Sequence, residues 1–122
     1  AIPARAGGKA VTVAQVLTER NFGSIPVVDE DKVLVGLISE FDLLKAMTDG
    51  KDLRKITAGD MMTPQEKLVT VTEETLVLDL IKILQDRHLI RVPVVKGKAL
   101  VGIVARRDVV FGYVKALARY WP

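Results

Sequence analysis

Hydrophobic positions predict the same series of elements in each half of the chain. In the second half, a strand at residues 68–71 precedes a helix at 75–88, strands at 92–95 and 99–105, and a final helix from residue 107 onward. Thr72 is positioned to cap the first of these helices, with Glu73 and Glu74 in its first turn. The order strand-helix-strand-strand-helix predicts a mixed α+β fold. The helix at 75–88 has an apolar face made of Leu76, Leu80, Ile83 and Leu84.

The first half begins the same series at Val11. Its opening strand is degraded, because an ungapped alignment places residues 1–4, which are poor strand formers, opposite residues 68–71. Residues 53–64 bridge the two copies, and their apolar side chains among turn formers predict a structured connector. The remaining elements of this half are a helix with Val13, Val16 and Leu17 on one face, strands at 25–28 and 33–38, and a helix with Leu43, Leu44 and Met47 on one face.

The duplication is visible in the amino acids themselves. The sequence Ile-Pro-Val-Val around Pro26 returns as Val-Pro-Val-Val around Pro93, and Gly36 of the first half returns as Gly102 of the second. Each copy is too small to bury its own apolar face well, so we expect the copies to pack on each other and to form the functional site between them. We assign residues 1–61 to the first copy and residues 62–122 to the second, together one globular domain.

Composition narrows the class of protein. The 122 residues are enough for one domain with an aliphatic core, because aromatic residues are few. The chain has no cysteine, which excludes disulfides, thiolate metal sites and cysteine nucleophiles and is typical of a reducing compartment, so we expect a cytoplasmic protein. There is no apolar run of membrane-spanning length and no evident secretory signal, so we expect no membrane partner.

Charge is unevenly distributed along the chain. Residues 1–61 hold eight Lys and Arg against nine Asp and Glu, whereas residues 62–122 hold ten against six. A basic second half favours a phosphate-bearing ligand or nucleic acid, but it is also typical of an ordinary solvated surface. Aromatic residues do not alternate with the basic ones as they do in a groove that binds single-stranded nucleic acid.

Residues that could support catalysis are scarce. The chain has a single histidine, His88, and no Walker or Rossmann loop. One histidine cannot build a metal site by itself, and its position near a helix end is typical of a surface or capping residue. We therefore expect a protein that is not an enzyme and requires neither a metal nor a cofactor.

The repeated motifs resemble a tandem pair of CBS domains, the regulatory module named after cystathionine β-synthase. The resemblance covers residues 11–120 and rests on Gly-Asp-Met-Met-Thr-Pro at 59–64, on Pro-Val-Val in each copy, and on Val-Gly, two hydrophobic residues, three variable residues and Asp at the end of each copy. It implies two repeats packed sheet against sheet with pseudo-two-fold symmetry and two clefts between them. It also implies a homodimer that binds an adenosine compound, such as AMP, ADP, ATP or S-adenosylmethionine, and regulates an effector domain or partner protein.

The ligand motif of this family, Gly-h-h-Thr/Ser-x-x-Asp with h hydrophobic, is complete once, from Gly36 to Asp42. The resemblance implies that Asp42 accepts hydrogen bonds from the ribose hydroxyls and that Ser39 bonds a ribose or phosphate oxygen. Ser39 and Asp42 are also a helix-capping pair, and capping alone explains both residues. The implied ligand-binding residues of this cleft, including those from the second copy against adenine and phosphate, are Leu37, Ser39, Asp42, Leu68, Val69 and Arg91.

The other cleft departs from the family pattern. Ala105 replaces the hydroxyl residue, and Ser24 occupies the position equivalent to Arg91. This cleft also draws on the degraded first strand, so we expect it to be the weaker site. Its implied residues are Ser24, Ile103, Arg107 and Asp108.

Three other interpretations remain open. The chain can be a dimerisation or interaction module without a ligand, a nucleic-acid-binding protein acting through Arg106 and Arg107, or the regulatory part of a longer enzyme, channel or transporter. The aromatic residues of the last helix either close the core or form a subunit interface, and we favour the interface. These residues are Tyr113, Tyr120 and Trp121.

Overall fold

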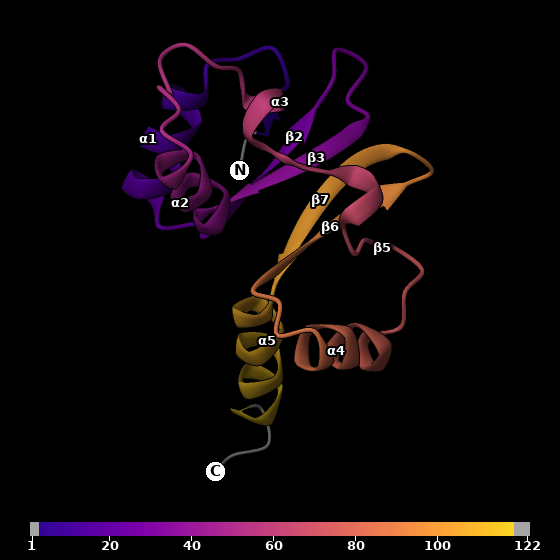
Figure 1. Ribbon diagram of the computed structural model, residues 1–122. Helices are drawn as coiled ribbons and strands as arrows, with labels where there is room; N and C mark the ends of the chain where they lie inside the picture. Colours follow the sequence, from indigo (N-terminus) through magenta and orange to yellow (C-terminus); the bar gives the residue numbers. More distant parts are fainter. Residues whose placement is uncertain (1–2, 119–122) are drawn as a thin grey trace.

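The computed structural model describes residues 3–118, which form two small sheets with helices beside each (Figure 1). The α+β fold expected from the sequence is confirmed. In chain order, the elements are β1 Ala4–Arg5, α1 Ala10–Arg20, β2 Ser24–Val28, β3 Leu34–Ser39, α2 Glu40–Thr48, α3 Ala58–Met61, β4 Thr63–Pro64, the 3₁₀ turn η1 Gln65–Lys67, β5 Val71–Thr72, α4 Val77–Asp86, β6 Arg91–Lys96, β7 Ala99–Ala105 and α5 Arg106–Ala118.

The two sheets share one pairing scheme. The first has the strand order β1-β2-β3-β4 and the second β5-β6-β7. In each, a two-residue strand runs parallel to the first strand of an antiparallel hairpin, with Ala4 opposite Val27 and Val71 opposite Val94. The alignment that matches Val27 with Val94 also matches Ala4 with Val71, so the degraded first strand still forms, and it forms in the expected register.

Two predictions about the start of the second repeat are wrong. The opening strand spans Val71–Thr72 rather than residues 68–71, because a 3₁₀ turn at Gln65–Lys67 delays the entry into the sheet. Thr72 does not cap a helix: its Oγ1 accepts from the backbone N–H of Glu74 at 3.2 Å, within a turn. As α4 begins only at Val77, Glu73 and Glu74 lie before the helix.

The first repeat has the larger core of the two. Helix α1 packs on the sheet through Val13 and Leu17, and the connector adds Ala58 and Met61, which are buried. The predicted structured connector is therefore confirmed. Buried residues of the second repeat cluster in a smaller group, Val71, Leu84 and Val92.

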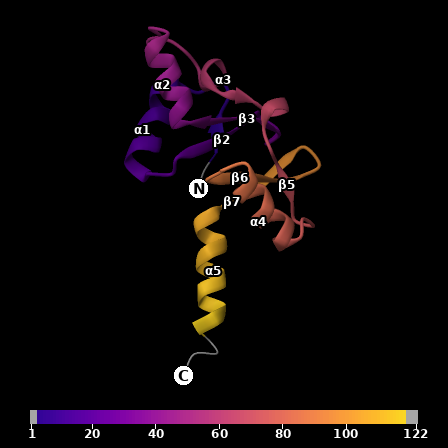
Figure 2. The ribbon, with the colours of Figure 1, turned by 60° about the horizontal axis from the view of Figure 1, so that its bottom comes forward.

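Part of the predicted helical core is exposed instead. On α2, Ala46 is buried, but Leu44 and Met47 are 55% and 67% exposed. On α5, Val109 packs against the second core cluster. The other apolar side chains predicted for this helix do not close the core, because α5 extends away from the sheets (Figure 2). The exposed residues are Val110, Tyr113, Val114 and Leu117, while Tyr120 and Trp121 lie outside the described residues.

The two repeats meet at the turns of their hairpins (Figure 1). The backbone N–H of Leu34 donates to the carbonyl of Lys98 at 3.0 Å, and that of Leu100 donates to the carbonyl of Lys32 at 3.1 Å. Each bond is the counterpart of the other, because Leu34 is equivalent to Leu100 and Lys32 to Lys98 in the two repeats. This reciprocity is the local signature of pseudo-two-fold packing, and it places the second strands of both hairpins beside the inter-repeat clefts.

Candidate functional site

The start of α2 fixes the position of the Asp42 carboxylate. Ser39 is the N-cap residue, and its Oγ accepts from the N–H of Asp42 at 3.4 Å. In return, Oδ2 of Asp42 accepts from the backbone N–H of Ser39 at 2.7 Å and from its hydroxyl at 3.0 Å. The capping box expected for this pair is confirmed, and it holds the carboxylate at the positive end of the helix dipole.

A third hydrogen bond to the Asp42 carboxylate comes from the connector. The hydroxyl of Thr63, on β4, donates to Oδ1 of Asp42 at 2.8 Å. Strand β4 pairs with β3 opposite Gly36, where a side chain would collide with the backbone oxygen of Thr63. The glycine of the motif therefore allows β4 to approach, and β4 in turn holds the aspartate.

The Asp42 carboxylate lines a cavity of about 360 Å³. Three lysines share its wall, Lys45, Lys51 and Lys67. Two further carboxylates, Asp49 and Asp60, are also present, so three aspartates face three lysines and the formal charges of the lining cancel.

A neighbouring cavity of about 300 Å³ lies between the repeats. It brings together four of the predicted ligand-binding residues, Leu37, Leu68, Val69 and Arg91, but not Ser39 or Asp42. Lys67 lines both cavities, so the cavity that contains the Asp42 carboxylate adjoins the cavity between the repeats. The remaining residues of its wall are Arg87, Leu89 and Pro93.

Arg91 has a structural role that the sequence did not indicate. Its Nη1 donates to the backbone carbonyls of Phe22 and Ser24 in the other repeat. Burial lowers the pKa of the Arg91 guanidinium, and the negative charge of Asp108 partly opposes this effect. The side chain is thus both a wall of the cavity and a bond between the repeats.

The second inter-repeat cleft has a volume of about 560 Å³. Of the residues predicted for it, Ile103 lines the wall, whereas Ser24 is buried in β2, and Arg107 and Asp108 are exposed on α5. Asp108 accepts from the N–H of Ala105 at 3.2 Å, which repeats one bond of the Ser39–Asp42 pair.

Several residues that line the clefts were missed from the sequence. Lys67 directly precedes the predicted Leu68, and Pro93 belongs to a repeated motif, so both could have been found. Arg5 and Lys32 supply the positive charge of the second cleft. These two residues belong to no motif, and the folded arrangement of the hairpins is needed to place them there.

Comparison with known proteins identifies the repeats. The family model described as "CBS domain" matches residues 6–49 and 58–115. The Arabidopsis thaliana protein named "CBS domain-containing protein CBSX3, mitochondrial" is 38% identical over 97 residues, covering 77% of this chain and 47% of that protein. The chain therefore spans about half the length of this curated relative.

Solved structures show the same fold. CBSX2 in complex with AMP has a TM-score of 0.79 and 25% identity, with 94% of this chain and 88% of that chain covered. AcuB from Vibrio cholerae has a TM-score of 0.84 and 21% identity, with 95% of this chain and 84% of that chain covered. In residues 3–118, none of the helices has the length and hydropathy required to span a membrane.

Proposed function

Because this chain belongs to the CBS domain family, we propose that it is a regulatory module that binds an adenosine nucleotide between its two repeats and does not catalyse a reaction. The observation that carries this proposal is the adjacency of two cavities with Lys67 on the wall of both. One offers apolar side chains to a flat base, and the other offers the oriented carboxylate of Asp42 to a sugar. The AMP complex of the related CBSX2 supports the choice of ligand class.

The chemistry of the walls fits the parts of such a ligand. Leu37, Leu68 and Val69 provide aliphatic contacts for adenine. A carboxylate has about four acceptor positions, and Asp42 accepts three hydrogen bonds within the protein, so it retains capacity for a ribose hydroxyl. The cations Lys67 and Arg87 can then approach the phosphate.

Arg91 can bind the ligand and also hold the two repeats together. Both of its hydrogen bonds to the first repeat use Nη1. A guanidinium has five N–H donors, so the same side chain can hold the repeats together and donate to a phosphate. A ligand that engages Arg91 would strengthen the contact between the repeats and bias an attached effector domain or a partner protein.

The experiment that tests the proposal is thermal unfolding with millimolar AMP, ADP, ATP, S-adenosylmethionine and NAD, one at a time. A ligand at about 100 times its dissociation constant stabilises the folded state by about 2.7 kcal/mol, which raises Tm by several degrees. We expect one adenosine compound to do so. If none raises Tm, the nucleotide proposal is wrong and an interaction module without a ligand becomes the better interpretation.

A matched pair of variants locates the site. Asp42→Ala removes the carboxylate from the cavity and also the N3 half of the capping box, whereas the Ser39 hydroxyl can still cap α2 through the backbone N–H of residue 42. Asp108→Ala removes the equivalent carboxylate of the second repeat, which lines neither of the two adjoining cavities. We expect the ligand-induced rise in Tm to disappear in Asp42→Ala and to persist in Asp108→Ala, whatever the Tm of each variant alone.

We further propose that the module is a homodimer. Large apolar side chains are exposed on three helices, among them Phe41 of α2, Leu76 at the start of α4 and Phe111 of α5, which are 80%, 70% and 67% exposed. Exposed apolar residues in such number are typical of an interaction surface rather than of an isolated monomer. A second copy of the chain offers the same helices and can cover them by two-fold symmetry.

A further inference from the structure

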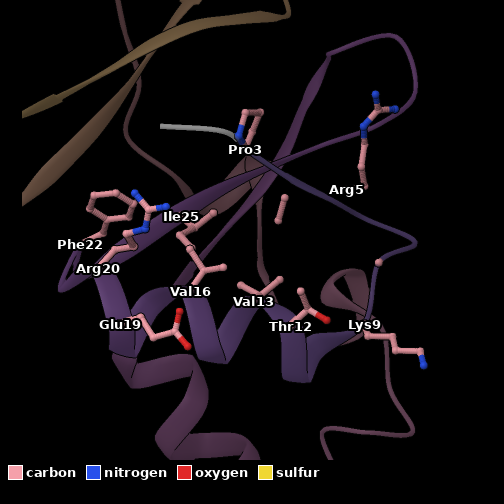
Figure 3. Close-up of a pocket in the computed structure, with 12 residues that line it drawn as sticks. Pro3, Arg5, Lys9, Thr12, Val13, Val16, Glu19, Arg20, Phe22 and Ile25 are labelled. Carbon is pink, nitrogen blue, oxygen red and sulfur yellow. The ribbon is translucent and has the colours of Figure 1, made fainter.

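A cavity of about 650 Å³ lies within the first repeat and is larger than either inter-repeat cleft. It is lined by the N-terminal segment from Pro3 to Arg5, by one side of α1, and by the start of β2 (Figure 3). Pro3 and Arg5 also line the second cleft, so they separate the two spaces. The α1 side of the cavity lines neither cleft and holds no residue of the proposed nucleotide site.

The floor of this cavity is apolar. Val13 and Ile25 are buried at its base, and Val16 and Phe22 are half-buried beside them. Figure 3 shows Val13, Val16 and Ile25 grouped between α1 and β2. Its volume falls within the range of roughly 300–1,000 Å³ that is usual for small-molecule sites, which are also mostly apolar.

The charges around the floor are unequal at the two ends. Figure 3 shows Arg5 and Lys9 on one side of the cavity and Glu19, Arg20 and Phe22 on the other. The formal charges of Glu19 and Arg20 cancel at their own end, although the two side chains do not form a close ion pair, and the other end of the lining has no acidic residue. Within residues 3–118, the one close ion pair is that of Arg54 with Asp52, so Arg5 and Lys9 have no close carboxylate there.

The two cations at this end of the cavity occur in the first repeat and have no charged counterparts in the second. In the alignment that matches Pro26 with Pro93, Arg5 and Lys9 correspond to Thr72 and Leu76, neither of which is charged. The apolar face of α1 has an apolar counterpart on α4 of the second repeat, because Val13 and Val16 correspond to Leu80 and Ile83. The apolar face is therefore a structural requirement of both repeats, whereas the two cations at its end are specific to this cavity.

We propose that the cavity binds a small anionic amphiphile: a carboxylate, sulfonate or phosphate head at Arg5 and Lys9, with a hydrocarbon body along Val16 toward Phe22. An apolar body would displace water from the floor, with a gain of about 25 cal/mol for each Å² of apolar surface buried. The head would form a charge-assisted hydrogen bond with one of the two cations, whose charged ends point in different directions in Figure 3. The sign of the head group follows from the surplus of positive charge, since a cationic amphiphile would meet Arg5 and Lys9 with like charge.

The test compares two probes with the same hydrocarbon chain and opposite charge. Decanoate and decyltrimethylammonium, both below their micelle concentrations, are titrated into the complete chain and followed by the methyl NMR signals of Val13, Val16 and Ile25. We expect decanoate to bind saturably and at least about tenfold more tightly than the cation, as one lost charge-assisted contact implies. Equal binding of both probes, the absence of saturation, or shifts confined to α4 and α5 would overturn the proposal.

Two variants make the assignment specific. Lys9→Glu reverses one exposed charge at the head position and should weaken decanoate binding by about tenfold or more. Lys82→Glu makes the same change on α4 of the second repeat, where Lys82 is exposed and lines none of the cavities described, and should leave binding within about twofold. Because both positions are exposed, both variants are expected to fold. Equal weakening by the two would show a non-specific effect of charge and would overturn the site.

Discussion

Arg91 lies over the ring of Phe22, with its guanidinium carbon 5.0 Å from the ring centroid. The two residues belong to different repeats, and the same guanidinium donates to the backbone carbonyls of Phe22 and Ser24. Phe22 also lines the large cavity beside α1, and Arg91 lines the proposed nucleotide cleft. One cation–aromatic pair thus connects the two candidate sites and holds the repeats together.

The first prediction concerns this pair. Arg91→Ala should lower the free energy of unfolding by about 1–3 kcal/mol, because it leaves two carbonyls, one of them on the buried Ser24, without their donor. Arg91→Lys should recover only part of the loss, since an ammonium cannot reproduce the planar guanidinium. Urea denaturation measures both changes.

Arg87→Ala is the matched control for this prediction. Arg87 lines the same cavity as Arg91 but is exposed and makes no hydrogen bond to the first repeat within the described part of the chain. Its removal should change the free energy of unfolding by no more than about 0.5 kcal/mol. A loss equal to that of Arg91→Ala would mean that Arg91 does not join the repeats.

The second prediction uses two equivalent glycines with different surroundings. A Cβ on Gly36 would lie 2.6 Å from the backbone oxygen of Thr63 and would also collide with Met62, whereas a Cβ on Gly102 would meet nothing within 4 Å. We expect Gly36→Ala to destabilise the protein by about 1–3 kcal/mol, as overpacking does. Gly102→Ala should be nearly neutral by the same denaturation measurement.

A functional consequence distinguishes this prediction from simple loss of stability. If β4 is displaced by Gly36→Ala, the hydroxyl of Thr63 can no longer hold Oδ1 of Asp42, and nucleotide affinity should fall as well. Gly102→Ala should leave that affinity unchanged. Similar unfolding curves for the two variants would contradict the role given to β4.

The repeated motifs made most of the fold predictable. The repeated Pro-Val-Val motif at Pro26 and Pro93 located both hairpins, and the serine–aspartate spacing located the start of α2. The prediction that Thr72 caps a helix failed because local hydrogen bonds compete for its hydroxyl. Threonine is as suitable a cap by type as the serine at position 39, but in the structure the Thr72 hydroxyl accepts from the N–H of Glu74 within a turn. Sequence pattern names the residues that can cap a helix and does not select among competing local bonds.

The candidate site was predictable only in part, for a physical reason. Leu37, Leu68, Val69 and Arg91 were expected together from the resemblance, and they line one cavity. The attachment of Asp42 to Thr63 depends on pairing between β3 and β4, which are separated in the chain by α2 and most of the connector. Contacts of this kind follow from the folded topology, so neither the Thr63 bond nor the inter-repeat bonds of Arg91 could be read from the motif.

The third prediction concerns pH. The backbone N–H and the hydroxyl of Thr57 lower the pKa of Asp60, which forms a capping box at the start of α3. A lowered pKa in the folded state gives stability that is present above the unfolded pKa of about 3.9 and is lost as pH falls through the folded value. NMR titration should therefore find the Asp60 carboxyl below the usual aspartate range. The difference in unfolding free energy between wild type and Asp60→Asn should shrink as the solution is acidified below about pH 4. A constant difference would contradict this account.

The fourth prediction concerns assembly. If the exposed helices are a subunit interface, light scattering after size-exclusion chromatography should give a mass twice the 13.4 kDa of one chain. Phe111→Glu places a charge on an apolar side chain of α5 that is 67% exposed, so it should shift the population toward monomer without unfolding the protein. Lys115→Glu, on the same helix, provides the charge-change control and should leave the mass doubled if its side chain lies outside the contact. A wild-type chain that remains monomeric at high concentration would contradict the dimer and leave the apolar faces of α2 and α5 to a different partner protein.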